Sequence, residues 1–142
     1  METERDDEIR IVGIVSDEVG LPRNDGSPGS SLYAVPFRLT RAPSPQWIRF
    51  FLRAWDLPPR FTSMHRPGIA KVIGDRVILD GTTIEEVEKY HLDTLKLAVT
   101  LANKLEREEK ATLRQRASAE EQKQERHRKH VEEIAKRLKF DN

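Results

Sequence analysis

The sequence predicts an α+β protein, a ββαββα two-layer sandwich whose long C-terminal helix extends beyond the domain. Three observations predict this fold. Four short segments have the composition of strands, and two of them are joined by a two-residue glycine turn. A helical segment with a proline at its start lies between the two pairs of strands. After Gly81 the chain contains neither glycine nor proline, so nothing interrupts a final helix.

The first pair of strands is predicted at residues 9–15 and 32–40. The first segment is short, β-branched and largely apolar. In the second, apolar side chains alternate with smaller or polar ones, which is typical of a half-buried strand. Because proline cannot donate a ladder hydrogen bond, Pro36 places this strand at a sheet edge or at a bulge. Residues 21–31 are rich in turn formers and are expected to form a loop.

A helix and a hairpin follow. Ser44 and Pro45 form the N-cap and first position of a helix whose residues Trp47, Phe51 and Trp55 recur at helical spacing. The hairpin spans residues 69–79, and glycine at the first position of its Gly74-Asp75 loop favours a type II′ turn. We therefore expect a four-stranded, mainly antiparallel sheet with both helices on one face.

The last helix is predicted to begin at Thr82 or Thr83. With either threonine as N-cap, a glutamate lies at the third helical position, as in a capping box. An unbroken helix to Leu138 would be ~85 Å long at 1.5 Å per residue. One apolar stripe is expected to face the sheet; its members are Ile84, Val87, His91, Leu95, Ala98, Ala102 and Leu105.

Further apolar rows flank that stripe. Tyr90, Leu97 and Leu101 lie to one side of it, and Leu92 and Val99 lie to the other. A helix resting on a sheet needs an apolar arc only slightly wider than about 100°. The excess predicts a second neighbour for residues 90–105, which is either the first helix or another subunit.

The remainder of this helix is charged. Between residues 106 and 130 the apolar side chains are three alanines and one leucine, which cannot bury a face. This part is a solvated helical spacer or is partly disordered when alone. Val131, Ile134 and Leu138 then restore a short apolar stripe, which is a docking face or a fraying amphipathic end. The predicted organisation is an acidic disordered tail (1–8), an α+β domain (9–105) and a charged helical extension (106–142).

Residues 41–71 combine basic and aromatic side chains. Such a combination is used to bind single-stranded nucleic acid, where bases stack on the aromatic rings. It is also common at protein interfaces, and it arises equally when arginines merely flank an aromatic core. The candidate surface residues for a nucleic acid or a protein partner are Arg41, Arg49, Phe50, Arg53, Arg60, Arg66 and Lys71.

Several classes of function have no support. The chain has no cysteine, which excludes disulfides and thiolate metal sites, and its net charge of +1 provides no global attraction to nucleic acid. Glu88 and His91 have the spacing of a di-metal motif, but there is no second copy. We therefore expect His91 to be a hydrogen-bonded core histidine and predict no catalytic residue, metal or cofactor. Without a signal or membrane-spanning segment, the expected location is cytoplasmic.

These observations favour a non-catalytic protein-interaction or assembly module. Its long helix would serve oligomerisation or partner docking, with a second copy or a different protein as the partner. The expected interface residues are Tyr90, Leu97, Leu101, Val131, Ile134 and Leu138. The alternative is a nucleic-acid-binding protein that uses the Arg/aromatic stretch 41–71, and an enzyme of unknown chemistry ranks third.

Overall fold

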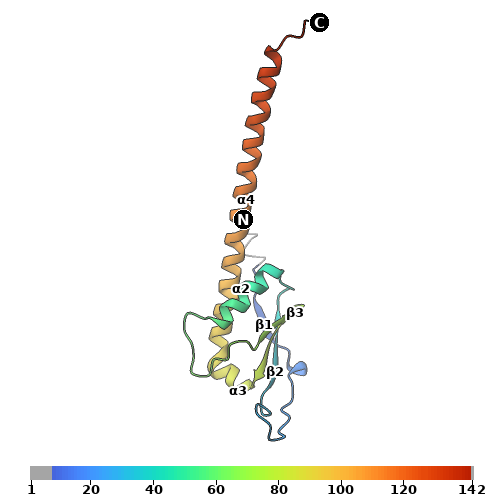
Figure 1. The fold of residues 1–142 in the computed structure, drawn as a ribbon. Helices are drawn as coiled ribbons and strands as arrows, with labels where there is room; N and C mark the ends of the chain where they lie inside the picture. Colours follow the sequence, from blue (N-terminus) through green and yellow to red (C-terminus); the bar gives the residue numbers. More distant parts are fainter. Residues whose placement is uncertain (1–7, 142) are drawn as a thin grey trace. The chain divides into compact units, whose positions relative to one another are not determined.

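The structure is a computed structural model that describes residues 8–141 (Figure 1). The disordered tail predicted at residues 1–8 lies outside the described residues, apart from Glu8. The chain divides into two compact units, Met1–Glu106 and Arg107–Asn142, and each is considered by itself. The first unit contains the sheet and the hydrophobic core, and the second is helical from its start to Arg137.

The sheet has four antiparallel strands, which confirms the predicted α+β fold. Their order across the sheet is β1-β2-β4-β3, so β1 and β3 form its two edges. The bounds are Ile11–Ile14 (β1), Tyr33–Leu39 (β2), Ala70–Ile73 (β3) and Arg76–Thr82 (β4). Gly74 has φ +59 and Asp75 has a negative φ, which is the pattern of the predicted type II′ turn. A short 3₁₀ turn, η1 (Ser16–Glu18), follows β1.

Both main helices pack on the same face of the sheet. Helix α2 (Pro45–Asp56) begins as predicted, because the Ser44 hydroxyl accepts a hydrogen bond from the Trp47 amide at 3.1 Å. Its buried face meets the inward side chains of β2 and β4. The largest fully buried core side chains are Trp47, Trp55, Phe37, Phe51, Ile9, Leu39, Leu79 and Leu95.

The C-terminal helix is not a single regular α-helix. It consists of one α-turn, α3 (Ile84–Glu86), a π-helical turn, η2 (Val87–His91), and the 46-residue α4 (Leu92–Arg137). The sequence does not predict the π-helical turn, because nothing in the composition of residues 87–91 distinguishes them from an ordinary helix. Such turns widen a helix by one residue and are frequent where side chains must be placed at a particular site.

The position of Pro36 differs from the prediction. Pro36 lies in β2, a central strand, and pairs with Ile78 of β4. It is not at a bulge either, because the register shifts of β2 lie between Tyr33 and Ala34 and opposite Ile11 and Gly13. Its carbonyl accepts a hydrogen bond from the Val15 amide at 3.0 Å, so its backbone polar groups face the β1 side of the sheet. The backbone N–H that proline lacks would point to the same side, beyond the end of β1. The hydrogen bonds between β2 and β4 are therefore unaffected.

Candidate functional site

The predicted assembly row on the C-terminal helix is partly covered. Tyr90 and Leu101 are half-buried, and Leu97 is 39% exposed. Helix α2 contacts α4 through the Trp47 indole, which donates to the Asn103 side chain at 2.9 Å. The first helix is therefore one neighbour of α4, but Asn103 faces the β1 side of the helix and not the Tyr90 row. The exposure of Leu97 shows that this row is incompletely covered.

The predicted distal stripe is exposed. Val131, Ile134 and Leu138 have exposed fractions of 50%, 37% and 55%. Leu138 lies just past the end of α4, and its amide still donates to the Ile134 carbonyl at 3.2 Å. The three side chains therefore remain in helical register on one face.

The Arg/aromatic stretch does not form one continuous surface. Of its aromatic residues, Trp47, Phe51 and Trp55 are fully buried. Phe50 is half-buried against the core, and Phe61 is 55% exposed. Most of the rings that could stack on bases are therefore part of the core, and this weakens the case for nucleic-acid binding.

The basic residues of this stretch point in different directions. Arg41, Arg49, Arg53 and Arg60 are exposed. Arg66 faces inward and forms an ion pair with Glu86 at 2.9 Å. Lys71 instead forms an ion pair with Asp80 at 2.8 Å on the sheet face opposite the helices. The predicted set is thus divided between two faces of the domain.

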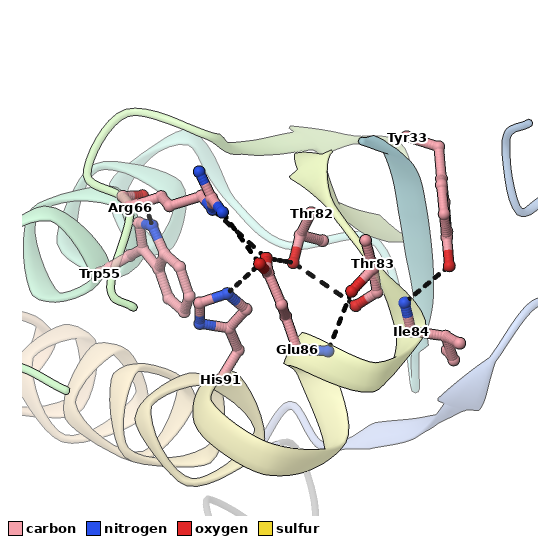
Figure 2. A network of polar contacts seen from close by, with 8 residues as sticks. All are labelled: Tyr33, Trp55, Arg66, Thr82, Thr83, Ile84, Glu86 and His91. Atoms are coloured by element: carbon pink, nitrogen blue, oxygen red, sulfur yellow. Dashed lines mark hydrogen bonds and ion pairs between the residues drawn. The ribbon is translucent and has the colours of Figure 1, made fainter. Parts of the chain in front are cut away.

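A partly buried polar network lies where the C-terminal helix begins, and Figure 2 shows Arg66, Thr82 and His91 pointing toward Glu86. The Glu86 carboxylate accepts two hydrogen bonds from the Arg66 guanidinium, at 2.9 and 3.3 Å. It accepts a third from the Thr82 hydroxyl at 3.0 Å. The Glu86 amide donates to the hydroxyl of Thr83, the N-cap, at 3.1 Å. Only this half of the predicted capping box forms, because the carboxylate is engaged elsewhere.

Two histidines, His91 and His65, lie beside the network. Burial of His91 is confirmed, but neither of its ring nitrogens has a hydrogen-bond partner among the described residues. Its Nε2 lies 3.9 Å from a Glu86 oxygen, which is too long for a hydrogen bond. The ring packs edge-on against Trp55, whose other close ring neighbour is His65. The prediction of a hydrogen-bonded core histidine is therefore only half right.

The network shifts two pKa values. Burial of Glu86 opposes its ionisation, but the hydrogen bonds from Arg66 and Thr82 and the charge of Arg66 outweigh it, so the pKa lies below its usual range. Burial lowers the pKa of His91, and the nearby charge of Glu86 only partly offsets this effect. At neutral pH the network is a charged Arg66–Glu86 pair beside a neutral His91.

This network has the properties of a structural clamp. The Trp55 indole donates to the Arg66 carbonyl at 3.1 Å, so Arg66 ties the segment after α2 both to α2 and to the start of the last helix.

No group of three or more metal-ligating side chains is arranged to hold an ion within residues 8–141. His91 has no solvent exposure, and a substrate could not reach it without rearrangement of the core.

A groove that the sequence did not predict runs between the edge strand β1 and the C-terminal helix. It has two adjoining hollows of about 370 and 350 Å³. Ile9 and Ile11 line the first and Ile14 lines the second, while Leu92 lines both. The sequence contains one signal for it, the apolar row of Leu92 and Val99 on the side of the helix away from Tyr90, but it does not show that β1 is an edge strand.

Comparisons of the chain with protein-family models, with curated proteins and with solved structures found no match. Among the described residues, no helix is long and apolar enough to span a membrane.

Proposed function

We propose that the protein is a non-catalytic assembly module whose C-terminal helix makes contacts with another protein chain. The observation that carries the proposal is the exposure of this helix. From Lys110 to Asp141 every described residue is exposed except Glu125, which is partly covered. Because most helices in proteins are stabilised by tertiary packing of an apolar face, a helix of this kind gains most from a partner.

The distal contact is assigned to Val131, Ile134 and Leu138. Their i, i+3, i+7 spacing forms a narrow apolar face of the kind that docks in a groove or against a second helix. Closer to the sheet, Tyr90, Leu97 and Leu101 offer a further row that is incompletely covered. Self-association is the form of assembly that can be tested with the chain alone.

The test is the mass of the protein in solution at about 100 µM, where weak self-association is populated. We expect a mass above 16.4 kDa that falls when Val131 and Ile134 are both changed to glutamate. The matched control is His130→Glu with Ala135→Glu, which adds the same charge next to the apolar stripe. An unchanged mass in the folded Val131→Glu/Ile134→Glu variant would contradict self-association through the helix.

Nucleic-acid binding is the second candidate. The observation that favours it is a pair of arginines, Arg49 and Arg53, one turn apart on the exposed side of α2 and without an ion-pair partner among the described residues. Binding of a single-stranded oligonucleotide should then weaken steeply with added salt. It should also weaken when Arg53 and Arg60 are changed to glutamine. Binding that is insensitive to both changes would rule this function out.

A further inference from the structure

The open edge of β1 presents unused backbone groups. The Arg10 carbonyl accepts from the Thr40 amide at 3.0 Å, so Arg10 faces β2 and Ile11 turns its own N–H and C=O to the outer side. At the other end the Val15 amide donates to β2, which turns the backbone of Ile14 outward as well. In a regular strand, residues three apart turn their backbone groups to opposite sides. The register shift between Ile11 and Gly13 allows both Ile11 and Ile14 to face outward.

This open stretch is closed at one end by a side chain. Asn103 of α4 accepts from the Ile9 amide at 3.1 Å and donates to the Ile9 carbonyl at 2.8 Å. The Asn103 amide thus makes the two hydrogen bonds that a neighbouring strand would make. From Ile11 to Ile14 no described residue does so, and exposed apolar side chains accompany the free edge: Val12 is 63% exposed and Ile14 38%. An edge strand of this composition favours pairing with another strand.

The charges along the groove differ between its ends. Arg10 and Lys96 line the hollow near Ile9, together with Glu8, and Glu85 and Glu88 line the hollow near Ile14. Lys96, Glu85 and Glu88 are exposed and have no ion-pair partner among the described residues. Leu92, which lines both hollows, lies midway between Glu88 and Lys96 along the helix. A surface that is basic at one end and acidic at the other is complementary to a reversed copy of itself.

From these observations we infer that β1 pairs with β1 of a second copy of the chain, antiparallel, about a two-fold axis that passes between Val12 and Gly13 and beside Leu92. In this arrangement Ile11 of each copy exchanges both backbone hydrogen bonds with Ile14 of the other. Lys96 of each copy meets Glu88 of the other, and the two Leu92 side chains meet at the axis. The two four-stranded sheets become one.

The inference rests on the proposed assembly function, for which it names the partner at this edge. It does not depend on the distal stripe. The two surfaces can therefore be tested separately in the full-length protein, and the results can differ.

The first experiment exchanges charges across the proposed axis. Lys96→Glu and Glu88→Lys should each raise the dimer dissociation constant about tenfold or more, because each places like charges opposite one another at two symmetric positions. The variant with both changes should recover the native constant. Within one chain these side chains are roughly 12 Å apart along the helix, so intramolecular pairing cannot explain the rescue. The inference would be overturned if both single variants dimerise more weakly and the double variant does not recover the native dissociation constant. It would also be overturned if neither single variant changes that constant.

The second experiment uses the absence of cysteine. Leu92→Cys creates one thiol on the axis, and mild oxidation should convert the chain to a disulfide-linked dimer. Leu97→Cys is the matched control on the other side of α4. Cross-linking through residue 97 and not through residue 92 would overturn the edge pairing while supporting assembly through the Tyr90 row. A mass that responds to the Val131→Glu/Ile134→Glu variant but not to the charge exchange would likewise retain the proposed function and reject this inference.

Discussion

At the start of the C-terminal helix, two sets of donors are available to the carboxylate of Glu86. A capping box would direct it to the N-cap backbone, as the local sequence predicts. In the structure it binds the Arg66 guanidinium and the Thr82 hydroxyl instead. Charge-assisted hydrogen bonds from a guanidinium are stronger than a bond from a neutral amide, so a distant residue outcompetes the local motif.

Replacement of Arg66 tests the importance of this clamp. Arg66→Ala leaves the largely buried Glu86 carboxylate without its cation, and we expect the free energy of unfolding to fall by about 1–3 kcal/mol, since the pair is partly accessible to solvent. Lys71→Ala, which breaks the exposed pair with Asp80, is the control and should cost less than about 1 kcal/mol. Both values can be measured by urea denaturation. Equal effects of the two changes would show that Arg66 is only a surface contact.

His91 should make stability depend on pH. Its folded-state pKa lies below the unfolded value, so below about pH 6.5 the unfolded chain binds more protons and stability falls, by at most about 1.4 kcal/mol per pH unit. Glu86 adds a further loss at lower pH, as the medium falls below its unfolded pKa near 4.5. The titratable and charged groups that face His91 are Glu86, His65 and Arg66.

The measurement is urea denaturation between about pH 7.5 and 5.5. His91→Leu should flatten the pH dependence in this range, because the buried group that resists protonation is gone. His127→Gln, a change at an exposed histidine of α4, should leave the dependence unchanged. A native slope that persists in His91→Leu would assign the pH dependence to another group.

At the scale of elements, the features that the sequence predicts correctly are those whose hydrogen bonds join residues close together in the chain. The Ser44-Pro45 start of α2 and the Gly74-Asp75 turn form as predicted, because each depends on residues within one turn. The edge position expected from Pro36 is wrong because it depends on which strands lie on either side of β2. The sequence does not predict the π-helical turn before α4 for a related reason: the residues that contact its side chains, such as Trp55, are distant in sequence.

Ser44 links α2 to α4 as well as capping α2. Its hydroxyl accepts from the Trp47 amide and donates to the buried carboxylate of Glu106. We expect Ser44→Ala to lower the free energy of unfolding by about 1–2 kcal/mol, through loss of the cap and of this second bond. Ser63→Ala, at an exposed position without such contacts among the described residues, should be nearly neutral. Equal stabilities of the two variants by urea denaturation would contradict the role of Ser44.

At the scale of the whole molecule, protection from hydrogen exchange should vary along α4. Leu95, Ala98 and Ala102 are buried, whereas the described residues beyond Lys110 are almost all exposed. In dilute protein the amides of the exposed part should exchange much faster, because no tertiary contact opposes local opening. Protection that rises with protein concentration, and does so less in the Val131→Glu/Ile134→Glu variant, would match the proposed assembly. Uniform protection along α4 at all concentrations would contradict it.

Periodicity and capping act over a few residues, so the fold class, the order of the elements and the starts of the helices and turns can be predicted from the sequence. The sequence also identifies residues 90–105 as a part of the helix whose apolar arc is wider than contact with one sheet requires. The complete fold is needed to place β1 at the edge of the sheet, to bring Asn103 to the backbone of Ile9 just before β1, and to turn Arg66 inward to Glu86. These features join residues far apart in the chain, and their free energies depend on which strands and side chains the complete fold brings together.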